Sequence, residues 1–382
     1  MFEEKFSKKL DLQRQAGLYR CPPCITKREG QYILVDNQRL LSFASNDYLG
    51  VSLMESLRQK IARNFLKYGA SAASSRLVAG NYDAINKAEK IYAQYFGYED
   101  GLFFPSGYQA NVGVLSTFFE HGDTIIFDKH IHASSIKGMA LSGAHFYGYN
   151  HGSMSHLEKR LETNKDRSVA VLTESLFSMD GNLLNVEAFG RLKNKHGFFS
   201  IVDEAHAFGV LGEKGRGIAA GVADVAVGTF GKAFGLFGAF ALLSFKSKEY
   251  LFNFCSPLIY TTTLPEAHAA SAMDVMEVIS ASDERRKYLR EISQRMKDEL
   301  KHEGFPVKGD AHILAVEIGQ EAHAIAIVQK LLERNIYILP ARFPTVPLHK
   351  AILRISMTAM HTEDDIRTFI RALKEAKNET RR

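Results

Sequence analysis

Hydrophobic and polar positions in the first hundred residues predict a helix, a hairpin and two further helices. The charged segment 1–20 is typical of an exposed helix, and residues 30–43 (GQYILVDNQRLLSF) predict a β-hairpin that turns at DNQ. Apolar residues at helical spacing predict helices over 53–69 and 82–97, each ending in a glycine. The small and polar segment between them, ASAASSRLVAG, predicts a loop that can approach a ligand closely.

Seven short apolar runs follow, most of them separated by segments of helix length. They lie at residues 101–104, 124–127, 145–149, 168–173, 198–202, 222–228 and 239–245. Runs that are apolar on both faces and alternate with helices are typical of a largely parallel sheet covered on both sides. The last two runs are close enough in the chain to allow an antiparallel turn. We therefore expect an α/β protein.

The pattern changes near residue 265. A long charged helix is predicted over roughly 265–303, and further helices alternate with the apolar strands HILAVEI, NIYILPA and ILRISMT. This order predicts a smaller α+β domain. We expect an N-terminal arm, 1–49, packed on the small domain, a large domain over 50–265, and the small domain over 266–382.

Composition and charge exclude several classes of protein. The 382 residues are 46% hydrophobic, which excludes wholesale disorder. The net charge of +5 is spread without a basic stripe, so we expect no nucleic-acid partner. No apolar stretch is long enough to span a membrane, and the charged N-terminus does not resemble a signal peptide. Three cysteines suit a reducing compartment. We expect a cytoplasmic protein with no membrane partner.

The strongest chemical signal is DEAH at the end of the run FFSIV. Ligands of open parallel sheets bind beyond the carboxyl ends of strands, where Asp203 and His206 would lie. A carboxylate there is costly without a partner, although a capping aspartate with a solvated histidine is an equally simple explanation. The same letters occur in DEAH helicases. That interpretation fails because Gly231-Lys232 is followed by Ala233, and the first glycine of a phosphate loop is missing at the required spacing.

A second signal is Lys232 within TFGKAFG. Most lysines are solvated surface groups, but these apolar flanks would desolvate the ammonium, lower its pKa and make it a nucleophile able to form a Schiff base. Together with an aspartate at another strand end, this suggests pyridoxal 5′-phosphate, whose ring nitrogen needs an anion. The turn PSGYQAN (105–111) offers a helix N-terminus for the phosphate, Thr229 a hydroxyl, and His132 an aromatic ring.

The chain as a whole resembles the α-oxoamine synthases, which are fold-type I pyridoxal-phosphate enzymes. The matching motifs run in order over nearly the whole chain: SNDYLG (45–50), SGYQAN (106–111), HAS (132–134), SMDG (178–181), DEAH (203–206), TFGKAFG (229–235), YTTTLP (260–265), RFPTVP (342–347) and LRISMTAMH (353–361). The resemblance implies an α/β fold-type I transferase with a mainly parallel seven-stranded sheet in the cofactor-binding domain and a smaller α+β C-terminal domain.

The resemblance also implies roles around the cofactor. Lys232 matches the Schiff-base lysine, Asp203 the acid at the pyridine nitrogen, and His132 the ring stacked on the cofactor. With His206, these would be the catalytic residues. The positions matching contacts to the ring oxygen or the phosphate are Ser178, His206, Gly107, Tyr108 and Thr229. Either Thr262 or Thr263 matches a hydroxyl that reaches the phosphate of the other subunit, which implies a homodimer with shared active sites.

Arg354 matches the arginine that receives the amino-acid carboxylate. In ILRISMT, alternation places Arg354 on the face opposite Leu353 and Ile355, where it is either a surface arginine or a bidentate carboxylate ligand. Other substrate-side positions of the family are matched by Asn46, Thr345 and Arg20.

The implied reaction joins an amino acid to an acyl thioester with loss of carbon dioxide. Within the family, the motifs are most similar to the member that converts L-alanine and pimeloyl-CoA or pimeloyl-ACP (acyl carrier protein) into 8-amino-7-oxononanoate in biotin biosynthesis. The alternatives are 2-amino-3-ketobutyrate CoA ligase, 5-aminolevulinate synthase and serine palmitoyltransferase activities. A catalytically silent regulatory subunit is a further alternative, although such a subunit would be expected to lack the lysine.

Two features depart from this picture. The loop over 69–76 is usually glycine-rich in the family, whereas alanines here make it stiffer and bulkier. Cys21 and Cys24 have the spacing of a redox motif, but they precede a predicted hairpin and enclose two prolines. A structural zinc needs four ligands, and Cys255 is the only other thiol in the sequence. We therefore expect no metal and interpret the pair as incidental.

Overall fold

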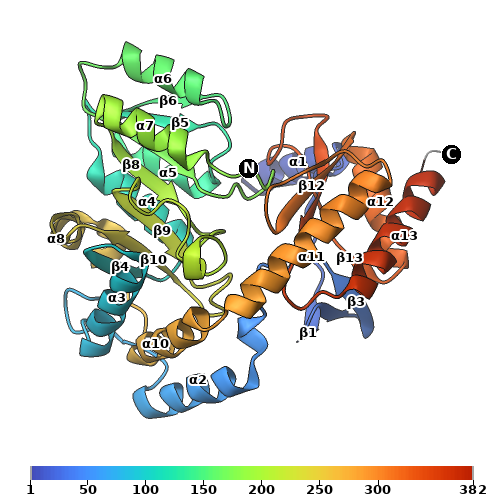
Figure 1. Ribbon diagram of the computed structural model, residues 1–382, viewed down its shortest axis with the longest axis horizontal. Coiled ribbons are helices and arrows are strands. Elements are labelled where there is room, and N and C mark those ends of the chain that lie inside the picture. The colour runs from blue at the N-terminus through green and yellow to red at the C-terminus, as the bar shows by residue number, and fades with distance from the viewer. Residues whose placement is uncertain (1, 381–382) are drawn as a thin grey trace. The chain divides into compact units, whose positions relative to one another are not determined.

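The structure is a computed structural model that describes residues 2–380 and forms two compact units (Figure 1). The large unit comprises Leu49–Ser178 and Leu183–Arg286. The small unit comprises the described chain up to Tyr48, the segment Met179–Asn182 and the chain from Lys287 onward. The large unit holds one seven-stranded sheet, and the small unit holds two four-stranded sheets.

All seven predicted apolar runs form strands of the large sheet, whose order is β4-β10-β9-β8-β7-β5-β6. Their bounds are β4 Asp100–Phe104, β5 Thr124–Asp128, β6 His145–Tyr149, β7 Val169–Glu174, β8 Phe199–Asp203, β9 Val225–Thr229 and β10 Ala239–Leu243. Strand β10 pairs antiparallel with both β4 and β9, and the other pairs are parallel. The expected mainly parallel sheet and its antiparallel turn are confirmed.

Helices cover both faces of this sheet because successive strand residues point to opposite sides. Ile125 and Ile201 pack in one hydrophobic cluster, whereas their neighbours Ile126 and Val202 pack in another. The helices of the first cluster are α4 (Gly107–Phe118), α5 (Ala133–Ser142), α8 (Phe245–Phe254) and α9 (Ser256–Ile259). Those of the second are α6 (Met154–Thr163) and α7 (Val186–His196).

An aromatic cluster fixes the turn that carries Lys232. Phe230 and Phe234, on either side of the lysine, are buried against Tyr92 of α3 (Asp83–Phe96) with ring centroids 5.2 and 5.9 Å away. Rings at these separations attract one another beyond the area they bury. The phenylalanines of TFGKAFG therefore anchor the turn in the core, while Lys232 itself is only half-buried.

The single long helix expected over 265–303 is wrong. The chain forms two helices there, α10 (Glu266–Ser280) and α11 (Asp283–His302). Ser282 interrupts the run, because its Oγ donates a hydrogen bond to the backbone oxygen of Val278 at 2.6 Å. Serine side chains that bond to nearby backbone groups in this way are favoured at helix ends.

Helix α10 belongs to the large unit. It packs against α2 (Glu55–Tyr68) and against α3. The chain divides between Arg286 and Lys287, so α10 and the first turn of α11 belong to the large unit, whereas the sequence suggests a division after residue 265. Two short 3₁₀ helices, η1 (Val51–Leu53) and η2 (Glu213–Gly215), complete the large unit.

The small unit joins the N-terminal arm to the C-terminal part of the chain. The predicted hairpin is confirmed, with Asp36 and Asn37 at φ of 48° and 63°, as a tight hairpin turn requires. One sheet contains β1 (Ile25–Glu29), β2 (Tyr32–Val35), β3 (Gln38–Ser42) and β13 (Ile336–Tyr337), and the other contains β11 (Val307–Lys308), β12 (Ile313–Gly319), β15 (Ala351–Ser356) and β14 (Leu339–Ala341). The accompanying helices are α1 (Phe2–Gln15), α12 (Glu321–Glu333) and α13 (Glu363–Glu379).

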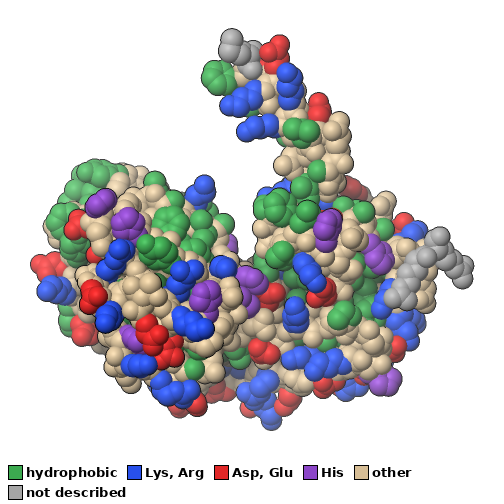
Figure 2. All heavy atoms as spheres, turned by 90° about the horizontal axis from the view of Figure 1, so that it is seen from above, with side chains coloured by type: hydrophobic (Ala, Val, Ile, Leu, Met, Phe, Trp, Pro, Cys, Tyr) green, Lys and Arg blue, Asp and Glu red, His purple; other side chains and the backbone are tan. Residues whose placement is uncertain are grey.

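Surface properties agree with the sequence composition. Lys and Arg side chains are interspersed with Asp and Glu on the face shown in Figure 2. Among residues 2–380, no helix combines the length and apolar character needed to cross a membrane.

His268 of α10 gives the large unit a pH-dependent stability. Burial lowers its pKa from 6.5 to about 4, and its Nε2 bonds to the backbone oxygen of Phe237. Between these two pH values the unfolded chain binds a proton that the folded chain excludes, so folding stability falls as the pH falls. We expect the group to account for about 3 kcal/mol by pH 4. His268→Gln should lose less stability than the parent between pH 6.5 and 4 in unfolding midpoints; equal losses would contradict this assignment.

Candidate functional site

The carboxyl ends of the parallel strands bring the predicted cofactor residues to one edge of the large sheet. Asp203 is the last residue of β8, Thr229 the last of β9, and Glu174 the last of β7. In the β7–β8 register Glu174 lies directly beside Asp203. The rule that ligands bind at this edge therefore applies to all three side chains.

Asp203 is 8% exposed and held by two donors. The Asn111 side-chain amide donates to Oδ2 at 2.8 Å, and the Ala205 backbone N–H donates to Oδ1 at 2.9 Å. Both donors favour the ionised carboxylate. The structure thus fixes the Asp203 carboxyl group at the strand end with two hydrogen-bond donors.

Asn111 also connects Asp203 to His132. Its amide donates to the Ser134 hydroxyl at 3.0 Å, and that hydroxyl lies 2.8 Å from Nδ1 of His132. His132 keeps an exposed surface. Partial burial of the ring lowers its pKa below the ordinary value, Asp203 opposes this shift and Lys232 adds to it. The imidazole is thereby held neutral near the half-buried lysine.

Glu174 is a site residue that the sequence reasoning missed. It is 2% exposed, and one carboxyl oxygen accepts the Ser178 N–H at 3.3 Å, while the other has no hydrogen-bond partner among the described residues. Burial raises its pKa well above the ordinary value, repulsion from Asp203 adds to the rise, and Lys232 opposes it. The signal that could have found it is a carboxylate directly after the apolar run SVAVLT.

The remaining cofactor-side predictions also lie in the large unit. His206, in the turn after β8, and Ser178, in the turn after β7, are 7% and 8% exposed. Lys232 acts electrostatically on both His132 and Glu174. The charges of Lys232 and Asp203 therefore both act on the imidazole of His132.

The expected phosphate position combines a helix N-terminus with a hydroxyl. Helix α4 begins at Gly107, after Ser106, whose side chain accepts the Gln109 N–H at 3.2 Å. A Cβ added to Gly107 would lie 3.8 Å from Cβ of Thr229, so the helix start and this hydroxyl are adjacent. Tyr108 is 49% exposed beside them. Helix N-termini of this kind bind phosphate.

Thr262 and Thr263 lie on a separate segment of the large unit. Thr262 forms an isolated antiparallel bridge with Ser75, and the Thr263 N–H donates to the Ser74 oxygen at 3.0 Å. Thr262 is exposed. The segment that contains these threonines is thus paired with the loop over 70–80.

In the small unit, Arg354 and Asn46 lie together. Arg354 is the one half-buried residue of β15, as the alternation predicts, and it donates to Ser356 Oγ at 2.7 Å and to Asn46 Oδ1 at 3.4 Å. Tyr48 also donates to Asn46 Oδ1, at 3.1 Å. Burial raises the pKa of Tyr48 to about 12, although Arg354 partly opposes the rise. Hydrogen bonds thus hold the Arg354 guanidinium beside Asn46 and Ser356.

Arg20 and Thr345 lie on exposed coil of the small unit. Among the described residues, Arg20 has no ion-pair partner, and helix α1 ends five residues before it instead of extending to residue 20. Cys21 and Cys24 follow as exposed free thiols.

Comparisons with known proteins agree with this arrangement. The family model for class I and II aminotransferases matches residues 38–373. The 8-amino-7-oxononanoate synthase of Chlorobaculum parvum is 36% identical over 370 residues, which cover 94% of each chain. A structure of serine palmitoyltransferase from S. paucimobilis with a bound PLP–myriocin adduct matches with a TM-score of 0.92 at 25% identity, covering 98% of this chain and 97% of that chain.

A second solved structure, 8-amino-7-oxononanoate synthase from Francisella tularensis, matches with a TM-score of 0.78 at 30% identity, covering 89% of this chain and 98% of that chain. The family model and these relatives span almost the whole sequence. The chain therefore belongs to the class I and II aminotransferase family, as an α-oxoamine synthase with the fold-type I transferase fold.

Proposed function

We propose that this enzyme condenses L-alanine with pimeloyl-CoA or pimeloyl-ACP, with loss of carbon dioxide, to give 8-amino-7-oxononanoate in cytoplasmic biotin biosynthesis. The observation that carries the proposal is the buried Asp203, fixed by Asn111 at the sheet edge where Lys232 and His132 also act. The 36% identity to an 8-amino-7-oxononanoate synthase supports the choice of substrates.

Pyridoxal phosphate fits the large-unit site. The strand-end carboxylate, the start of α4 beside Thr229, and the partnerless oxygen of buried Glu174 form a polar surface suited to a charged ring and its phosphate. When bound, the cofactor supplies an electron-accepting ring that stabilises negative charge at the α-carbon of the amino acid.

The chain's own residues divide the remaining work. Lys232 Nζ would hold the cofactor covalently and, as a free amine, would accept the α-proton of the amino acid. Asp203 would keep the ring nitrogen protonated, and His132 would cover the ring. His206 and Ser178 support the ring oxygen, while Gly107, Tyr108 and Thr229 hold the phosphate.

Arg354 receives the amino-acid carboxylate. A guanidinium fork recognises a carboxylate with two parallel hydrogen bonds, and Ser356 and Asn46 already fix its orientation. We assign Thr345 and Arg20 to the acyl side, where the exposed Arg20 offers a cation to the free carboxylate of the pimeloyl chain. Its exposure leaves room for a long acyl carrier.

We also propose a homodimer in which Thr262 or Thr263 reaches the phosphate of the second copy. Large apolar side chains next to this segment are exposed, at 66% for Leu77, 79% for Val78 and 80% for Tyr260. Exposed apolar patches of this kind mark interaction surfaces.

The competing functions make different demands. The similarity to serine palmitoyltransferase keeps serine with a long acyl thioester as the second candidate. Glycine with acetyl or succinyl thioesters remains possible within the same family. A silent regulatory subunit is disfavoured because Lys232, Asp203 and His132 are all present.

Borohydride reduction of the holoenzyme should fix the cofactor on Lys232. The reason is the position of Lys232 next to the anchored Asp203 and His132. Peptide mapping by mass spectrometry should find the pyridoxyl group on the Lys232 peptide. A pyridoxyl group on another lysine would overturn the assignment of this site.

Asp203→Asn should retain the fold and some cofactor, because an amide can keep the backbone contact to Ala205. It cannot stabilise a protonated ring nitrogen, so we expect turnover to fall by about two orders of magnitude or more. Steady-state rates at saturating substrates measure this. Near-normal turnover with normal cofactor content would show that Asp203 does not face the ring nitrogen.

Product analysis tests the substrates directly. With alanine and pimeloyl thioester, mass spectrometry should detect 8-amino-7-oxononanoate, and Arg20→Ala should raise the KM for the acyl substrate about ten-fold while sparing kcat. Parallel reactions contain serine with palmitoyl thioester and glycine with acetyl or succinyl thioesters. Product only in those reactions would refute the substrate assignment and leave the cofactor chemistry intact.

A further inference from the structure

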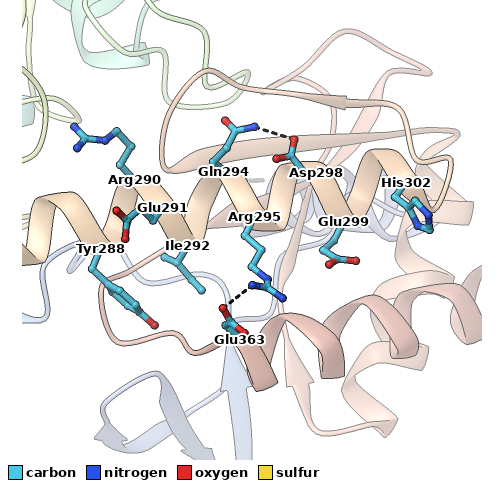
Figure 3. A pocket seen from close by; sticks show the side chains of 10 residues that line it. All are labelled: Tyr288, Arg290, Glu291, Ile292, Gln294, Arg295, Asp298, Glu299, His302 and Glu363. Carbon is cyan, nitrogen blue, oxygen red and sulfur yellow. Dashed lines mark hydrogen bonds and ion pairs between the residues drawn. The ribbon is translucent and has the colours of Figure 1, made fainter.

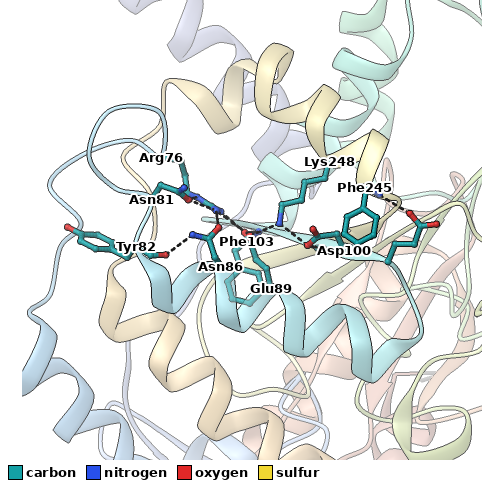
Figure 4. A network of polar contacts seen from close by, with 11 residues as sticks. Arg76, Asn81, Tyr82, Asn86, Glu89, Asp100, Phe103, Phe245 and Lys248 are labelled. Atoms are coloured by element: carbon teal, nitrogen blue, oxygen red, sulfur yellow. Dashed lines mark hydrogen bonds and ion pairs between the residues drawn. The ribbon is translucent and has the colours of Figure 1, made fainter.

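A buried ion-pair network lies beneath the loop over 70–80 in the large unit (Figure 4). Arg76 leaves this loop with a side chain 1% exposed, and its guanidinium contacts both carboxyl oxygens of fully buried Glu89. Its Nε and Nη2 also donate to Asn81 Oδ1 at 2.9 and 2.7 Å. A planar fork with partners on several nitrogens fixes both position and direction.

Glu89 connects the loop to the edge of the central sheet. Besides Arg76, it accepts the backbone N–H of Phe103 in β4 at 2.8 Å and Lys248 Nζ at 3.1 Å. Lys248 also donates to Asp100 Oδ1 at 2.8 Å. The cations Arg76 and Lys248 thus neutralise the carboxylates of Glu89 and Asp100. Through Glu89 the loop is connected to strand β4.

The same loop pairs with the segment that contains Thr262 and Thr263. Ser75, directly before Arg76, pairs with Thr262, and Ser74 accepts the Thr263 N–H. A Cβ on Gly80 would lie 2.7 Å from the Ser74 oxygen and 2.8 Å from Thr263 Cγ2. The loop and the threonine segment therefore pack too closely to move independently.

Local strain indicates that tertiary contacts determine this loop. Ala73 has a φ of 51°, in the left-handed region that costs a residue with a Cβ free energy. Such strained positions persist only where surrounding contacts over-determine them. The Arg76–Glu89 pair, three residues later, supplies a rigid contact of that kind.

We propose that Arg76 and Glu89 are positioning residues that set the affinity for the cofactor phosphate by placing the Thr262 and Thr263 hydroxyls. The inference rests on the proposed phosphate site shared between two copies. It adds that the buried Arg76–Glu89 pair of each copy influences how tightly that site binds the phosphate. A merely stabilising ion pair would affect unfolding without affecting cofactor affinity, because removing one partner of a buried pair destabilises the fold.

Arg76→Lys tests the geometry, because it keeps the charge and removes the fork. In the folded protein we expect the dissociation constant for pyridoxal phosphate, measured by titration of the cofactor-free protein, to rise about ten-fold, the size of one lost charge-assisted hydrogen bond. Asn81→Ala, which removes the acceptor of two guanidinium nitrogens, should act in the same direction. If Arg76→Lys does not fold, the dissociation constant of Asn81→Ala tests the proposal instead.

A matched control is the Lys193–Asp224 pair of the same unit. Lys193 Nζ contacts Asp224 at 2.6 Å and the Ser200 hydroxyl at 2.7 Å, with no contact to the loop. Lys193→Met should lower the unfolding midpoint without changing the dissociation constant. An equal loss of cofactor affinity in Lys193→Met and Arg76→Lys would overturn the proposal, because it would indicate general destabilisation.

A double-mutant cycle separates the inference from the proposed function. Thr262→Ala/Thr263→Ala should itself weaken cofactor binding, and adding Arg76→Lys should weaken it no further. If the threonine variant binds weakly but Arg76→Lys and Asn81→Ala bind normally, the positioning role is wrong and the shared site stands. An additive loss would likewise overturn the positioning role. Normal binding by the threonine variant would refute both the shared site and this inference.

Discussion

The site depends on two carboxyl groups, Glu174 and Asp203, that end adjacent parallel strands side by side. Neither can be buried as a bare charge, because desolvation is costly and like charges repel. Asp203 accepts hydrogen bonds from Asn111 and Ala205, which suits the ionised form. The pKa of Glu174 is instead well above its ordinary value, which suits the neutral form. Two chemically similar groups thus lie in different environments on adjacent strand ends.

The hydrogen bonds of Asp203 also depend on the helices at the same edge of the sheet. Asn111 belongs to α4 and Ser134 to α5, so the path from Asp203 to His132 requires both helices in place. The close packing of α4 on α5 explains Gly138, where a Cβ would lie 2.9 Å from the Asn111 backbone oxygen. The close contact at Gly138 thereby helps to fix Asn111 and Ser134, and through them the position of His132.

Much of this could be predicted from the sequence, because local patterns carry it. Apolar runs located all seven strands, and the strand-end rule located Asp203. The same rule applied to SVAVLT would have located Glu174. Asn111 belongs to the motif SGYQAN. Nothing in the local sequence indicates that its amide faces Asp203, because the two residues are 92 positions apart. The break at Ser282 was missed because helical periodicity continues on both sides of it.

Substrate-side residues were harder to predict for a different physical reason. Arg354 is fixed by strand alternation and by Ser356, two residues away, so its setting follows from local sequence. Arg20 and Thr345 lie on exposed coil, where no periodicity constrains a side chain.

A groove of about 870 Å³ beside α11 in the small unit is lined by both acidic and basic residues, including an Arg295–Glu363 ion pair (Figure 3). Arg295 and Glu363 are about half exposed, and ion pairs on the surface contribute little to stability. By contrast, the Arg76–Glu89 pair is buried beneath a strained loop. The contrast between these two charged regions shows why burial and geometry identify functional charge better than the volume of a groove does.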